Sequence, residues 1–185
     1  MRAVNRIVGA GLASLSLLAF AASASAQEVV EQPRLRQGFW AGLGLGHGSL
    51  GCEGCDTREG ALSGNLRLGG TLSQKLLLGF ESNTWYKSED GGSLEMSNGS
   101  AIAVFYPSET GGFHLKGGLG VSRLRAAIEG LGSDSEWGVG AVLGVGYDFR
   151  VARNISLTPY LNGVGGNFDG GTANFWQIGL GFSWH

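Results

Sequence analysis

Charged side chains are scarce in this chain. Only 15% of its 185 residues are Asp, Glu, Lys or Arg, whereas 43% are hydrophobic, and the formal net charge is −2. Because a soluble surface carries about 25–35% charged residues, we expect something other than water to cover part of this protein. The chain is too apolar for a disordered protein, and its slight acidity predicts no nucleic-acid partner.

Long apolar runs are also few. One run, at residues 7–20, follows Arg2 and Arg6 and precedes the small residues Ala24-Ser25-Ala26, which is the pattern of a cleavable secretory signal peptide. The alternative is an uncleaved N-terminal anchor helix. Behind this segment no run approaches the roughly 20 residues that a membrane-spanning helix needs. The predicted organisation is a signal peptide at 1–26, a short periplasmic segment at 27–37 and one folded domain at 38–185.

Proline is rare and glycine abundant, with 3 and 35 residues respectively. Glycine does not recur at every third position, which excludes collagen, and each glycine inside a helix costs about 1 kcal/mol, which disfavours a helical bundle. Apolar residues instead alternate with small or polar ones, as in 137–149 and 176–184. A period of two predicts strands with one apolar face. Eight such segments lie at about 38–49, 61–71, 75–86, 94–106, 112–124, 136–149, 154–165 and 174–184.

The lengths of the connections predict an orientation. Short connections are expected near 73–74, 107–111 and 150–153, and they alternate with longer ones near 51–60, 87–93, 126–134 and 167–173. Outer-membrane barrels alternate tight periplasmic turns with larger outer loops in this way, and each segment is long enough to cross a bilayer as a tilted strand. Both termini are then expected on the periplasmic side.

Aromatic residues distinguish a membrane barrel from a soluble, lipocalin-like one. Two predicted aromatic girdles bracket an aliphatic band, which is the outward pattern of a membrane barrel. We therefore predict an all-β, eight-stranded antiparallel transmembrane β-barrel, monomeric, in the outer membrane of a Gram-negative envelope. The predicted periplasmic girdle consists of Phe39, Tyr106, Phe113, Tyr147, Phe149 and Trp184, and the outer girdle of Tyr86, Trp137 and Trp176.

Three stretches resemble a known family. Residues 175–185 resemble the C-terminal strand by which outer-membrane barrels are recognised for insertion, and 144–149 with 153–160 resemble the sixth and seventh strands of the OmpA/OmpX-like outer-membrane β-barrel domain family. The resemblance implies contacts with outer-membrane lipid and lipopolysaccharide and with the barrel-insertion machinery. His185 departs from the family, which usually ends on an aromatic residue. Pro159 lies in mid-strand, where it cannot donate to a closed ladder, so we expect a bulge or a weakened ladder there.

The polar residues of the predicted inward face decide between a plugged and an open lumen. Arg67 and Glu81 both face inward, and if Thr71 pairs with Lys75 they lie diagonally across two strands. A buried arginine needs a carboxylate partner, so we predict a lumen charge pair that plugs the barrel. The alternative is a small, selective, porin-like channel. Because family members include anchors, adhesins and small channels, we predict a structural, envelope-anchoring or surface-interaction role with at most a narrow pore.

Cys52 and Cys55 lie in the first predicted outer loop. Exported chains meet an oxidising periplasm, which favours a disulfide between them. The alternatives are a metal site with Glu53 and Asp56, which lacks further soft ligands, and a redox pair, which usually sits at a helix N-terminus. We predict no metal and no cofactor.

One constellation carries a possible enzymatic activity. His47 and Ser49 share a face of the first strand, and Glu59 lies across the hairpin, which is similar to the His-x-Ser and Glu arrangement of outer-membrane lipid A deacylases. In that alternative Ser49 is the nucleophile, His47 the base and Glu59 the residue that orients the imidazole. The simpler interpretation is an interfacial histidine and a serine at a loop start, so we expect no enzyme. His114 is expected to be a partner of Asp148.

Overall fold

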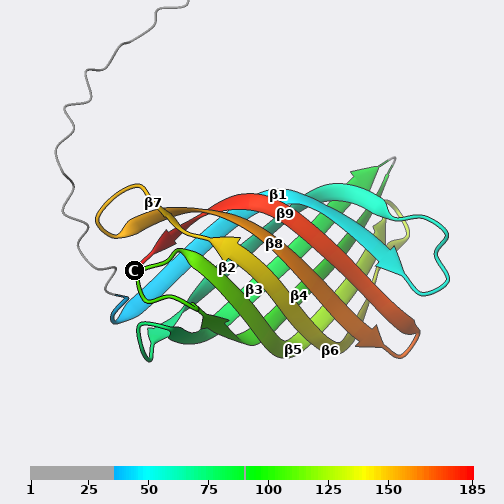
Figure 1. Cartoon of the computed structure of the whole chain (residues 1–185). Helices are drawn as coiled ribbons and strands as arrows, with labels where there is room; N and C mark the ends of the chain where they lie inside the picture. The colour runs from blue at the N-terminus through cyan, green and yellow to red at the C-terminus, as the bar shows by residue number, and fades with distance from the viewer. Residues whose placement is uncertain (1–35, 90) are drawn as a thin grey trace, which may run out of the picture. The chain divides into compact units, whose positions relative to one another are not determined.

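A computed structural model describes residues 36–89 and 91–185, which form a closed antiparallel barrel of tilted strands (Figure 1). Neighbouring strands follow the order β6-β5-β4-β3-β2-β1-β9-β8-β7, and pairing of β6 with β8 closes the sheet. Because the two-residue β7 continues β6 beyond Asp148, eight strands build the wall, as predicted. The strands are β1 (Phe39–Cys52), β2 (Glu59–Thr71), β3 (Leu76–Glu89), β4 (Gly92–Phe105), β5 (Phe113–Ile128), β6 (Gly132–Tyr147), β7 (Phe149–Arg150), β8 (Ile155–Phe168) and β9 (Gly171–Trp184).

The predicted signal peptide and most of the predicted periplasmic segment lie outside the described residues. Among the residues that are described, no helix is long and apolar enough to span a membrane.

The two ends of the barrel differ from the prediction in the lengths of their connections. Strands β3 and β4, and likewise β8 and β9, are joined by only two residues, where we expected longer loops. Gly91 and Gly130 adopt φ near +80°, a conformation that glycine allows, so the hairpins turn tightly. The predicted contrast between short and long connections is therefore wrong: the polar residues assigned to loops continue the strands. We call the end of the barrel with the β1–β2, β3–β4, β5–β6 and β8–β9 connections the hairpin end. The opposite end, which carries Arg36 and His185, is the terminal end.

The register fixes how strongly the strands tilt. Following hydrogen-bonded neighbours once around the wall from Gly42 leads through β2, β3, β4, β5, β6, β8 and β9 back to Cys52, ten residues further along β1. A stagger of this size requires strands tilted by roughly 35–45° to the barrel axis. Because of this tilt, residues that are not paired in the ladder can lie at the same height along the barrel axis and meet inside the lumen.

The outward face of the wall is apolar. Exposed aliphatic residues such as Leu43, Leu119 and Ile178 form its middle, and eight of the nine predicted girdle residues lie exposed on this face. Tyr106 is the exception, since it is only 2% exposed and belongs to the lumen. Its assignment to the girdle is wrong because β4 carries apolar residues on both faces near its end; Phe105, 46% exposed, is the outward residue there.

The ladder is interrupted beside Pro159. Gly146 pairs with Tyr160 and Phe149 with Leu157, whereas the residues between them are unpaired across these two strands. The weakened ladder that Pro159 predicts is confirmed, and it occurs without an extra residue in either strand. On the other side of the strand the ladder with β5 continues, since the backbone N–H of Asp148 donates to the Gly112 carbonyl at 2.9 Å.

Candidate functional site: the lumen

A buried ion pair crosses the middle of the lumen. Lys116 Nζ donates to both carboxylate oxygens of Glu81, at 2.5 and 2.6 Å, and both side chains are almost completely buried. Glu81 is in β3 and Lys116 in β5, so the strand tilt brings together residues that are not paired in the ladder. Because a buried charge is costly without a partner, the pair neutralises both groups in place.

The predicted Arg67–Glu81 charge pair is not what the structure contains. Arg67 lies directly opposite Glu81 in the ladder, because Thr71 pairs with Leu77 and not with Lys75. Its guanidinium nevertheless donates to Ser183 Oγ at 2.6 Å, while the Glu81 carboxylate binds Lys116. The prediction placed both residues correctly on the inward face and chose the wrong cation.

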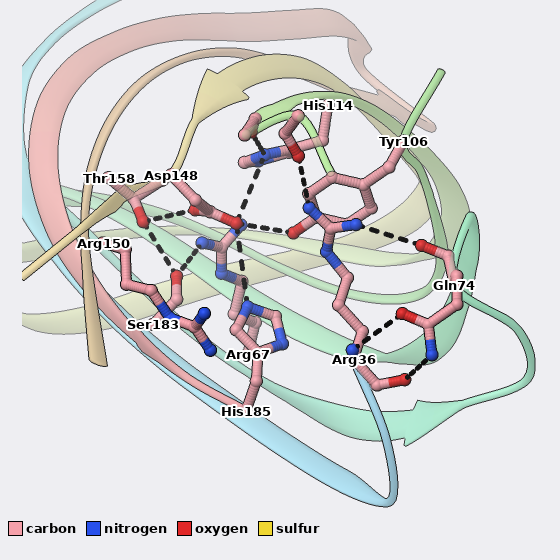
Figure 2. A network of polar contacts seen from close by, with 12 residues as sticks. Arg36, Arg67, Gln74, Tyr106, His114, Asp148, Arg150, Thr158, Ser183 and His185 are labelled. Atoms are coloured by element: carbon pink, nitrogen blue, oxygen red, sulfur yellow. Dashed lines mark hydrogen bonds and ion pairs between the residues drawn. The ribbon is translucent and has the colours of Figure 1, made fainter. Parts of the chain in front are cut away.

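Asp148 is the centre of a second polar cluster, at the terminal end (Figure 2). Its carboxylate accepts hydrogen bonds from Tyr106 Oη and Thr158 Oγ1, each at 2.7 Å. Ring nitrogens of His114 and His185 lie 3.8 and 3.6 Å from its Oδ2, so His114 neighbours Asp148 as expected. The departure of His185 from the family pattern thus has a structural role, since its ring turns toward the lumen while Trp184 faces outward.

The surroundings of Asp148 shift two pKa values. Burial alone would raise the pKa of Asp148, but nearby His185, the charges of His114 and Arg67 and the hydrogen bond from Thr158 outweigh it and lower the pKa below its ordinary value. Burial and the negative charge of Asp148 raise the pKa of Tyr106 well above its ordinary value. Asp148 is therefore an anion that Tyr106 and Thr158 solvate in place of water.

Arg36, just before β1, covers this cluster. Its backbone N–H donates to Gln74 Oε1 at 2.9 Å, and its guanidinium donates to the carbonyls of Gln74, Glu109 and Gly111. The guanidinium carbon also lies 3.5 Å from the ring centroid of Tyr106. Arg36 thereby joins two connections of the terminal end across the mouth of the barrel (Figure 2). No period-two pattern in the sequence could have identified this residue, because it lies outside the strands.

Apolar side chains fill the lumen near the hairpin end. Trp85, Met96 and Phe175 are at most 1% exposed and belong to one cluster with Leu50 and Phe168. Trp85 Nε1 donates to the Gly48 carbonyl at 3.2 Å, so the indole lies against a stretch of wall that has no side chain. Alternation in the sequence does not predict this cluster, because an inward aromatic residue follows the same period of two as an outward one.

Glycines on the inward face make room for these side chains. A Cβ at Gly42 would meet the Arg67 side chain, and one at Gly140 would meet Asn98 and Ser122. The side chains of Arg67, Asn98 and Ser122 therefore occupy space that a side chain at these glycines would fill. The glycines thus let the wall come close to the inward side chains.

The first connection of the hairpin end contains the predicted disulfide. Cys52 and Cys55 are bonded, with their Cα atoms 5.3 Å apart. The backbone N–H of Glu53 also donates to the Thr172 carbonyl at 2.9 Å, which ties this connection to β9. In the described part of the chain, no three His, Cys, Asp or Glu residues are placed to hold a metal ion.

The residues of the possible hydrolase site bind other partners. Ser49 Oγ accepts a hydrogen bond from Arg58 Nε at 3.2 Å, and Glu59 forms an ion pair with Lys87 at 2.6 Å. The imidazole of His47 is exposed and lies over Gly60. Arg58, which no sequence pattern singled out, also donates to Asn174 of β9 and so joins the first connection to that strand.

Comparison with solved structures identifies the fold as that of small outer-membrane barrels. Neisserial surface protein A superimposes with a TM-score of 0.59 at 15% identity, covering 79% of this chain and 96% of that one. Ail, the attachment invasion locus protein of Yersinia pestis, superimposes with a TM-score of 0.60 at 15% identity, covering 81% and 100%. A second Ail structure, in complex with the heparin analogue sucrose octasulfate, gives 0.57 at 16% identity, covering 81% and 100%.

Neither family models nor characterised proteins compared by sequence give a match. The fold and the outward apolar face define a transmembrane β-barrel of the outer-membrane type. At this level of identity the similarity concerns the fold alone.

Proposed function

We propose that this protein is a sealed outer-membrane barrel with a structural, envelope-anchoring or surface-interaction role. The observation that carries this proposal is the filling of the lumen at three levels: the Trp85 cluster at the hairpin end, the Glu81–Lys116 pair in the middle and the Asp148 cluster under Arg36. A permeant ion would have to break a buried ion pair and displace packed aromatic side chains, which is energetically costly.

The orientation follows from the general architecture of such barrels. An even number of crossing strands puts both termini at one end, which we assign to the periplasm after export by a cleaved signal peptide. The hairpin end then faces the cell exterior. Strand β9, with its alternating outward residues, is the segment through which the insertion machinery would recognise the chain.

Two of the similar proteins support a surface role. One is a neisserial surface protein, and the other is an attachment invasion locus protein, one structure of which holds a heparin analogue. Such roles need a stable barrel and an exposed end, and they need no pore.

Single-channel recording in planar bilayers tests the sealed lumen. We expect rare and small conductance events from the purified chain, under conditions in which a general porin gives frequent, stable openings. The double variant Trp85→Ala with Met96→Ala removes apolar residues that fill the hairpin end, and its conductance should stay low because the Glu81–Lys116 pair still crosses the lumen. Replacing Glu81 and Lys116 as well should increase the conductance. Frequent ion-selective openings of the unmodified chain would overturn the proposal in favour of a channel.

A further inference from the structure

Two arginines extend the lipid-facing side of β5 toward the hairpin end. Successive outward residues of this strand are apolar, among them Leu119 at 72% and Val121 at 51% exposure. The next two outward positions are Arg123 and Arg125. Arginine costs about 2–4 kcal/mol at the midplane of a bilayer and about 0–1 kcal/mol near its surface, so this change marks the membrane boundary on β5.

Arg123 lies in a row of polar and aromatic residues that share its face. The ladder places Ser97 beside Arg123 on one side and Trp137 on the other, and Thr84 beside Ser97. Directly opposite residues of antiparallel strands project to the same side of the sheet. Two hydroxyl groups and a guanidinium therefore face outward together. The guanidinium carbon is 5.4 Å from the ring centroid of Trp137, a residue of the aromatic girdle.

Nothing in the described part of the chain neutralises Arg123. No carboxylate lies within 4.0 Å of its guanidinium, and its Nε atom is buried without a hydrogen-bond partner. Glu95 lies opposite Arg125 in the ladder, and Arg125 donates weakly to Ser133 Oγ at 3.4 Å. Glu95 is thus the ladder neighbour of Arg125, and among the described residues Arg123 has no carboxylate partner at the membrane boundary.

We propose that this row, Thr84–Ser97–Arg123, binds the phosphate group of an anionic lipid in the outer leaflet. Guanidinium groups bind phosphate through two parallel charge-assisted hydrogen bonds, and serine and threonine hydroxyls can donate to the remaining oxygens. Arg125 adds positive charge next to the site. The inference rests on the proposed orientation of the hairpin end, and it is independent of whether the lumen is sealed.

The position of the row favours a lipid over a dissolved phosphate ion. Its residues are on the face that also carries the exposed apolar residues of β5, and Trp137 flanks it at the level where headgroups begin. A lipid whose phosphate binds this row would place its acyl chains beside exposed apolar residues such as Val121, which a dissolved ion does not contact.

The test measures lipid binding to the full chain purified in non-ionic detergent. Native mass spectrometry quantifies how much protein carries phosphatidic acid or, separately, phosphatidylcholine. Because each arginine near a membrane surface contributes about 1 kcal/mol to binding anionic lipid, we expect Arg123→Gln to weaken phosphatidic acid binding about fivefold. Arg123→Lys should have an intermediate effect, since it retains the charge and loses the paired donors, and Ser97→Ala should weaken binding less. Arg153→Gln, an exposed arginine in the connection at the terminal end, is the matched control and should have no effect.

Three results would overturn the proposal. Equal binding of phosphatidylcholine and phosphatidic acid would show that phosphate charge is not recognised. Equal losses in the Arg123→Gln and Arg153→Gln variants would show a general charge effect. Binding of inorganic phosphate with the same dependence on Arg123 would identify a soluble ligand instead of a lipid. Each variant must first show the heat-dependent gel mobility of an intact barrel. The lipid-binding result does not depend on the lumen, so a failure here would leave the sealed-barrel proposal, which channel recording tests, unaffected.

Discussion

At the scale of single residues, the two buried inward carboxylates, Glu81 and Asp148, belong to separate polar clusters. Glu81 is neutralised by Lys116, and Asp148 is held by Tyr106 and Thr158. The period of two predicted that Arg67 and Glu81 face inward, but it could not predict their partners. The tilt of the strands decides which distant residues meet, and the sequence pattern of a single strand contains no information about tilt.

The Glu81–Lys116 pair gives the sharpest stability prediction. Glu81→Gln leaves the Lys116 ammonium buried and unpaired, so we expect a loss of about 3–5 kcal/mol in the free energy of unfolding. Urea titration in detergent, followed by cold gel mobility, measures it. The double variant Glu81→Gln with Lys116→Gln should recover much of the loss. Arg67→Gln serves as a comparison. Removing the true partner of Glu81, as in Lys116→Gln, should lower the free energy of unfolding strongly, and Arg67→Gln would do the same only if Arg67 were that partner. A neutral effect of Glu81→Gln would contradict the structure.

Asp148 should make the stability depend on acid pH. Its pKa is lower in the folded than in the unfolded chain, so its contribution is fully present above the unfolded pKa of about 4 and is lost as the pH falls toward the lower folded value. The unmodified chain should therefore be more stable than Asp148→Asn at pH 7, with the difference shrinking below pH 4. Asp56→Asn, in the first connection, is the control. A difference that stays constant down to pH 2 would argue against this role.

At the scale of elements, alternation located all eight crossing strands, whereas it misplaced their ends. Residues such as Ser88 and Ser133 are polar, and polar residues at strand ends are indistinguishable from loop residues when only one sequence is considered. Pro159 was more informative, because in a closed barrel every strand is paired on both sides and a missing backbone donor must interrupt one ladder. Tyr106 was misassigned where both faces of β4 are apolar and alternation loses its meaning.

The disulfide of the first connection should matter little for assembly. Its bonded residues are only three positions apart, and the chain-entropy contribution of so small a ring is about 2 kcal/mol or less. Replacing Cys52 and Cys55 with serine should leave insertion and heat-dependent gel mobility intact. The unmodified protein should take up a thiol-alkylating reagent only after reduction; labelling of both cysteines without reduction would exclude the bond in the exported protein.

At the scale of the whole molecule, a wall without open edges surrounds a filled lumen, and its outward face is apolar. Composition and girdles predicted the apolar outward face, since both reflect contact with lipid, whereas the plugged lumen was predicted only through the Arg67–Glu81 pair. The filling of the hairpin end by Trp85, Met96 and Phe175 was not predictable, because an inward aromatic residue follows the same alternation as an outward one.

The lipid A hydrolase alternative leads to a direct experiment. We expect no change in the acylation of lipid A when cells produce the protein, because Ser49 and Glu59 bind Arg58 and Lys87 instead of a shared imidazole. Mass spectrometry of extracted lipid A makes the comparison, with Ser49→Ala and His47→Asn as paired variants. Loss of one acyl chain that both substitutions abolish would establish an enzyme.

In the orientation proposed above, the tight hairpins also limit how much unpaired chain the protein presents to the cell exterior. With two or three residues joining β5 to β6 and β8 to β9, the polar residues at this end belong to hydrogen-bonded strands and not to loops. The connection between β1 and β2, residues 53–58, is the longest at the hairpin end. A disulfide closes it, and Arg58 ties it to β9. Intact cells treated with protease should therefore retain the protein uncut, because proteases cut exposed unpaired chain and residues 53–58 are the longest unpaired stretch at this end.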